Sequence, residues 1–176
     1  MDPAMPACPY VQLDVFGDRP GAGNPLAVIP DARGLNDADM QAIARWTRLP
    51  ETTFVFPSPT ATADYALRIF SPRREVPFAG HPSVGTAHVL LDRQLVAPRD
   101  GLLVQSCAVG ELPLRVDGEG RRRTVAVRTP RASVIEVADA GDPRLRDALA
   151  GLDTGTLPPV LMDGGVRRRR ALLVVA

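Results

Sequence analysis

The sequence contains no lysine, so its 21 basic residues are all arginine. They are balanced by 20 acidic residues, and a net charge of +1 provides no strong field to steer the chain toward nucleic acid or anionic lipid. Aromatic residues make up only 5%, so the arginine runs at 121–123 and 167–170 lack the stacking side chains of a nucleic-acid site. We therefore expect no nucleic-acid partner and interpret both runs as solvated hairpin ends or linker.

Cysteines and long apolar runs are also scarce. The two cysteines, Cys8 and Cys107, are too few for a disulfide framework or a zinc cage. No apolar run approaches the roughly 20 residues of a membrane span, and the first ten residues lack the features of a signal peptide. These absences predict a reduced, cytoplasmic protein without a membrane partner or a metal site.

The residues that are present suit a globular protein, with 45% hydrophobic and 23% charged residues. Residues 10–16 alternate between apolar and polar, which is typical of a half-buried strand. Residues 17–25 form a loop rich in glycine and proline. Further strands are expected at 26–29, 52–57, 63–70, 102–105, 111–116 and 124–128. Many strands with two helices predict an α+β fold with a mostly antiparallel, curled sheet.

Two helices are expected among these strands. The first begins after Asn36, a good N-cap, with Leu35 and Met40 at the positions of a hydrophobic staple, and Pro50 ends it. The second begins at Pro82, because proline is tolerated at the first helical position.

After residue 130 the pattern weakens. Residues 142–149 favour a short helix, and 151–160 resemble a loop. The apolar run at 171–176 predicts a strand whose edge would be exposed.

Glu51 stands between the first helix and an apolar strand. A glutamate held in such surroundings can have a raised pKa, which suits a general acid and base. The alternative is a surface residue at a bend, and the local pattern leaves both readings open.

Residues 77–87, PFAGHPSVGTA, carry the densest signal. A helix that begins at Pro82 would leave the N–H groups of Ser83, Val84 and Gly85 free to bind a carboxylate or phosphate. His81 would lie at the edge of this site with a pKa near neutrality. The alternative is a simple helix entrance.

Asn24 follows a G-x-G at residues 21–23. A dinucleotide loop would need a third glycine and a helix directly afterwards, and Pro25 with a short strand follows instead. We therefore expect a tight loop in which Asn24 caps the chain or lines a cleft.

Taken in order, VFGDRPGAGNPLAVI, LPETTFVF, PFAGHPSVGTAHVLL and VGELPLRV make the chain similar to the PhzF-like (phenazine biosynthesis) proteins, which are relatives in fold of diaminopimelate epimerase. The resemblance covers residues 10 to about 130. It implies two similar halves, each a curled, mostly antiparallel sheet wrapped around a central helix, with the active site between them.

The resemblance also implies a reaction. Characterised members are isomerases that move a proton within a small cyclic or unsaturated carboxylic acid, of which a dihydro-3-hydroxyanthranilate is the type, without metal or cofactor. Glu51 matches the general acid/base, and the residue before it, usually serine, is Pro50 here. His81 matches the histidine that orients the substrate, and the helix start around Gly85 faces its carboxylate. We therefore expect substrate contacts from His81, Pro82, Ser83, Val84, Gly85 and Asn24.

Family members are about twice as long as one such domain. We expect residues 1–130 to be a complete first domain and 131–176 the start of a truncated second one. The competing hypothesis is a non-catalytic half-protein that is inactive, or acts only when paired with another chain, and its exposed apolar face would favour a homodimer. An epimerase with two cysteines is disfavoured because His81 occupies the position of a thiol.

Overall fold

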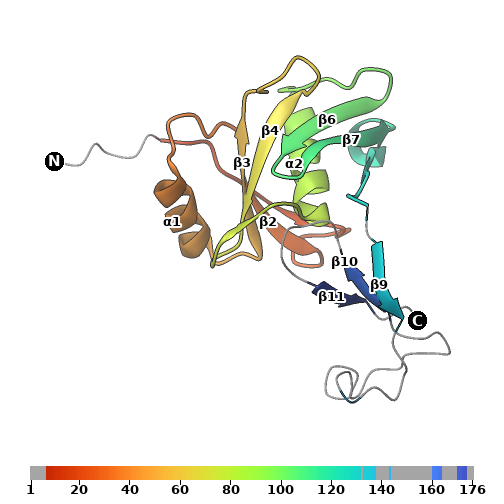
Figure 1. Cartoon of the computed structure of the whole chain (residues 1–176). Helices are drawn as coiled ribbons and strands as arrows, with labels where there is room; N and C mark the ends of the chain where they lie inside the picture. The colour runs from red at the N-terminus through yellow and green to blue at the C-terminus, as the bar shows by residue number, and fades with distance from the viewer. Residues whose placement is uncertain (1–6, 132, 138–142, 144–159, 164–169, 174–176) are drawn as a thin grey trace. The chain divides into compact units, whose positions relative to one another are not determined.

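The computed structural model describes residues 7–131, 133–137, 143, 160–163 and 170–173. The chain forms two compact units, Met1–Thr129 and Pro130–Ala176 (Figure 1). Whether the second unit is the start of a truncated domain stays a prediction. In the described part of the chain, no helix has the length and apolar character needed to cross a membrane.

An eight-stranded sheet forms the frame of the first unit, within the residues described. The β2–β3 and β4–β6 pairs are parallel and the other pairs are antiparallel, which confirms the expected mostly antiparallel sheet. The hydrogen-bonded order is β1 (Val11–Val15), β2 (Asn24–Ile29), β3 (Glu51–Phe56), β4 (Tyr65–Phe70), β6 (Leu102–Cys107), β7 (Gly110–Asp117) and β8 (Thr124–Val127), and the short β5 (Glu75–Val76) pairs with β4.

The helix α2 (Gly80–Asp92) lies at the centre of the sheet's concave face, where it contacts β1, β2, β3 and β8. Nine of its thirteen residues are buried, including the polar Ser83 and Thr86, as expected of a core helix. It begins at Gly80, two residues before the predicted start at Pro82. Pro82 is tolerated there because the first four N–H groups of a helix have no intrahelical acceptor.

The helix α1 (Asp37–Thr47) begins as predicted. The Asn36 side chain accepts a hydrogen bond from the N–H of Asp39, and the Asp39 carboxylate accepts one from the N–H of Asn36. Leu35 and Met40 are both buried in the cluster beneath the helix, as a hydrophobic staple requires.

The strand β3 is buried on both faces, which explains its nearly continuous run of apolar and threonine side chains. Val55 packs in the cluster around α2, whereas Phe54 packs in the cluster beneath α1 and meets Phe70 edge to face at 5.4 Å. Figure 1 shows the two helices on opposite sides of this strand. Because β3 is fixed from both sides, its first residue has a well-defined place.

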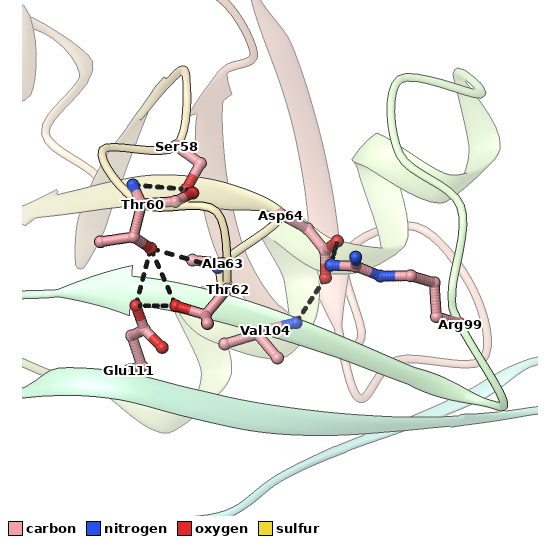
Figure 2. Close-up of polar contacts among 8 residues, drawn as sticks. All are labelled: Ser58, Thr60, Thr62, Ala63, Asp64, Arg99, Val104 and Glu111. Atoms are coloured by element: carbon pink, nitrogen blue, oxygen red, sulfur yellow. Dashed lines mark hydrogen bonds and ion pairs between the residues drawn. The ribbon is translucent and has the colours of Figure 1, made fainter.

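Polar contacts fasten the entry to β4 onto β6 and β7 (Figure 2). The Asp64 carboxylate accepts from the N–H of Val104 at 2.7 Å, and the Asp64 N–H donates to the Val104 carbonyl at 2.8 Å. The Glu111 carboxylate accepts from the hydroxyls of Thr60 and Thr62 at 2.7 and 2.8 Å. Because β4 and β6 pair over only two residues, these contacts extend a short parallel pairing.

The second unit contains the described strands β9 (Ser133–Val137), β10 (Val160–Asp163) and β11 (Arg170–Leu173). They form an antiparallel sheet in the order β11-β10-β9. The predicted helix at 142–149, apart from Pro143, lies outside the described residues, and so does the predicted loop at 151–160, apart from Val160, which begins β10.

Candidate active site

Glu51 is the first residue of β3, in parallel register with Leu26 of β2. The preceding helix ends at Thr47, before the predicted stop at Pro50, because Arg48 adopts a left-handed conformation with a φ of 56°. The turn that follows delivers Glu51 to the strand with a side chain that is only 20% exposed. Glu51 is therefore not a solvated residue on a surface bend.

His81 is the second residue of α2. The N-cap, Ala79, has no side chain that could cap the helix. A helix that begins at Gly80 leaves the N–H groups of Gly80 and His81 without intrahelical acceptors. The prediction that the Ser83 N–H is free is wrong, because it donates to the Ala79 carbonyl at 3.3 Å. The N–H groups without intrahelical acceptors are thus about one turn earlier than predicted, and their binding of an anion stays a prediction.

Three predicted site residues from separate elements meet here. Nε2 of His81 lies 3.4 Å from Oε2 of Glu51. On the other side of the ring, Nδ1 of His81 lies 3.2 Å from Nδ2 of Asn24, the first residue of β2. The structure therefore assembles a row of amide, imidazole and carboxyl groups from β2, α2 and β3.

The contact between Glu51 and His81 is not a conventional ion pair. Both facing atoms are buried, and neither has a hydrogen-bond partner among the described residues, so the 3.4 Å approach lacks hydrogen-bond geometry. Burial raises the pKa of the Glu51 carboxyl and lowers the pKa of the His81 imidazole. An ion pair would shift both pKa values the opposite way, so desolvation dominates and the neutral forms are favoured.

The remaining predicted contacts, residues 82–85, face the interior of the unit. Pro82 and Val84 are buried, and the Ser83 hydroxyl donates to the Ala79 carbonyl. Gly85 packs against the sheet so closely that an added Cβ would lie 2.6 Å from a methyl group of Val15. Their expected contact with a substrate carboxylate stays a prediction, whereas their packing role is visible.

A polar chain behind the helix start is not predicted from the sequence. The Gln105 side chain donates to the Ser83 hydroxyl at 3.2 Å and accepts from the Tyr65 hydroxyl at 3.4 Å, and all three residues are buried. Side chains alternate between the two faces of a strand, so Gln105 lies on the same face as the fully buried Leu103. This alternation is the feature of the sequence that indicates a buried Gln105.

A pair of threonines also fixes α2 against β3. The hydroxyls of Thr53 and Thr86 lie 2.9 Å apart, and Thr53 also donates to the Ala27 carbonyl. These buried bonds hold α2 in register beside the strand that carries Glu51.

A groove of about 880 Å³ lies along the loop between β1 and β2, with Pro25 and Leu49 in its lining. Glu51, His81 and Asn24 do not line it, although Gly23 and Pro25 on either side of Asn24 do. A second cavity of about 620 Å³ lies near the opposite end of α2, around Leu90. Within the described residues, no group of three or more His, Cys, Asp or Glu side chains could hold a metal ion.

The family model for phenazine biosynthesis-like proteins (PhzC-PhzF) matches residues 13–175. The chain belongs to this family. Among solved structures, a predicted epimerase from Pseudomonas aeruginosa is 33% identical, with a TM-score of 0.75 over 90% of this chain and 57% of that one. A Bacillus anthracis protein of the PhzF family is 27% identical, with a TM-score of 0.73 over 93% of this chain and 54% of that one.

Two curated relatives complete the comparison. Antisense-enhancing sequence 1 of Schizosaccharomyces pombe is 36% identical over 160 residues, which cover 89% of this chain and 54% of that protein. The trans-2,3-dihydro-3-hydroxyanthranilate isomerase of Pseudomonas fluorescens is 51% identical over 81 residues, 46% of this chain and 29% of that enzyme. The chain spans about half the length of the first of these relatives.

The expected diaminopimelate epimerase-like α+β fold is confirmed. A probable proline racemase, at 17% identity and a TM-score of 0.59, shares the fold. The roles of the site residues, the cytoplasmic location and the homodimer stay predictions.

Proposed function

We propose that this chain carries the acid/base residue of a cofactor-independent isomerase that moves a proton within a small cyclic or unsaturated carboxylic acid. The observation that carries the proposal is the buried Glu51 carboxyl, which lies 3.4 Å from His81 and whose pKa is raised by desolvation. A carboxyl with a raised pKa is available as both acid and base nearer to neutral pH.

In the proposed reaction, the Glu51 carboxylate removes a proton from a carbon beside a double bond of the substrate. The electron pair delocalises into the conjugated system, and protonated Glu51 returns the proton to a different carbon. One C–H bond breaks and another forms, so no oxidant or reductant is needed. The N–H groups of Gly80 and His81 at the start of α2 would hold the substrate carboxylate.

Solvent exchange tests the proposal. The chain is incubated with trans-2,3-dihydro-3-hydroxyanthranilate in D2O, and deuterium uptake is followed by NMR. Loss of a general acid/base lowers a rate by about 10²–10⁴-fold, and we expect such a loss in Glu51→Gln. His88→Gln is the matched control, because His88 lies on the same helix but is 41% exposed and contacts Asp92 instead. Undiminished uptake in Glu51→Gln, or none by the unaltered chain, contradicts the proposal.

The competing hypothesis is a half-protein that acts only when paired with another chain. It merits a test because the chain matches only 54% of the length of the first curated relative. Sedimentation velocity at several concentrations separates the two. A folded monomer that exchanges deuterium supports the isomerase alone, whereas exchange only in a dimer supports pairing.

A further inference from the structure

We infer that Asn24 is a positioning residue that holds His81 in its Nε2–H tautomer, so that His81 presents a hydrogen-bond donor, and not a second base, to the space it shares with Glu51. The inference deepens the proposed function and rests on it for its catalytic meaning. The tautomer itself is a property of the resting protein.

The first step is the chemistry of the contact. Nδ2 of Asn24 lies 3.2 Å from Nδ1 of His81. A side-chain amide nitrogen only donates hydrogen bonds, so Nδ1 must accept. A neutral imidazole carries one N–H, and when Nδ1 accepts, that hydrogen is on Nε2.

The second step is the direction of the other nitrogen. Nε2 of His81 faces Oε2 of Glu51 at 3.4 Å, and both atoms are buried. The Nε2–H therefore lies beside the Glu51 carboxyl, without a hydrogen bond to it in the resting structure. A ring held this way can donate to a substrate oxygen or to the Glu51 carboxylate, but it has no lone pair there to accept a proton.

The third step is the backbone position of Asn24, whose side chain is exposed. It begins β2 and pairs with Val15 of β1, while Leu26, two residues later, pairs with Glu51. The loop before it is tight, since a Cβ on Gly23 would lie 2.6 Å from the Val15 carbonyl oxygen. The sheet that places Glu51 thus also places the amide that contacts His81.

If His81 is held as a donor, the proposed reaction uses Glu51 as its single base. Because His81 donates and Glu51 alone takes up the proton, removal and return of the proton occur from the same side of the substrate. A two-base exchange from opposite faces would instead need Nε2 as an acceptor.

Nitrogen NMR of the resting chain tests the tautomer without any turnover. The sequence has only two histidines, so His88→Gln assigns the signals of both. Long-range ¹H–¹⁵N correlation distinguishes Nε2, which couples to both ring carbon-bound protons, from Nδ1. Above the titration of His81, we expect Nε2 to be the protonated nitrogen in the unaltered chain.

Two substitutions separate positioning from packing. Asn24→Asp replaces the donor by an acceptor of the same shape, so the ratio of Nδ1–H to Nε2–H should rise about tenfold or more, and the titration of His81 should move to higher pH. The Asn24 donor stabilises the neutral ring by its hydrogen bond to Nδ1, and Asn24→Ala removes it. The titration of His81 should therefore also move to higher pH, but by less than in Asn24→Asp.

His88 is the control within the molecule, because it lies on α2 and its Nε2 contacts Asp92 at 3.3 Å. Its signals should not change, which shows that the helix is intact. A proton on Nδ1 in the unaltered chain, or a His81 tautomer and titration unchanged in both Asn24 variants, overturns the inference. If deuterium exchange fails while these shifts occur, the isomerase proposal is wrong and the positioning role stands.

Discussion

Replacing Gly85 by alanine tests whether this glycine serves the packing of α2 or the approach of a ligand. Its added Cβ would lie 2.6 Å from Cγ2 of Val15 and 2.7 Å from Cδ2 of Leu26. Val15 is β-branched and stiff, so it cannot rotate away without strain. Overpacking a core costs about 1–3 kcal/mol, and both contacts are severe enough for the upper half of that range. Alanine recovers about 1 kcal/mol of helix propensity, which leaves a net loss of about 1–2 kcal/mol.

Urea unfolding measures this loss as a lower midpoint with an unchanged m value. The matched control is Gly80→Ala on the same helix, because no atom lies within 4 Å of a Cβ added there. We expect that control to be neutral or slightly stabilised. Shortening Val15 in the Gly85→Ala background should recover part of the loss, and a double-mutant cycle isolates this coupling. If Gly85→Ala is as stable as Gly80→Ala, the packing argument is refuted.

Three other substitutions probe charge and pairing. Glu51→Gln should raise the free energy of unfolding, and the gain should grow as pH rises above 4.5. Burial penalises only the charged carboxyl, so the folded pKa of Glu51 is raised and the charged form costs stability. A pH series of urea titrations that shows no such trend contradicts this prediction. Asp64→Ala should lower the free energy of unfolding by about 1.5–3 kcal/mol and speed hydrogen exchange at Val104, because it removes the acceptor of the Val104 N–H. Arg99→Ala removes a side chain that is 66% exposed and should cost under about 1 kcal/mol. Equal losses in the two variants would contradict the role of the bond to the Val104 backbone.

Local signals in the sequence predicted local structure well. The cap at Asn36 and the buried pair of Leu35 and Met40 depend on residues within one helical turn, and the structure has both. The helix α2 begins two residues before the predicted start, because proline is tolerated at the first helical position and also at the third. Within a single turn, nothing in the chain distinguishes these positions.

Long-range contacts were predicted only as far as the family resemblance reached. Asn24 and His81 are 57 residues apart, and no spacing rule connects them. The hydroxyl pair of Thr53 and Thr86 and the bond from Gln105 to Ser83 form only once the sheet has folded around α2. Tertiary packing decides which polar side chains face inward, and the sequence marks them only by their place in a strand pattern.

Because α2 is buried on most of its sides, the candidate site should be lost together with the fold of the whole unit. A helix of thirteen residues that is buried on most of its sides has little stability outside its sheet, so we expect it to form and melt with the whole unit. His81 is attached to the first turn of that helix. The row of Asn24, His81 and Glu51 should therefore disappear in one step with cooperative unfolding, and the backbone amides in the middle of α2 should be among the slowest in the chain to exchange.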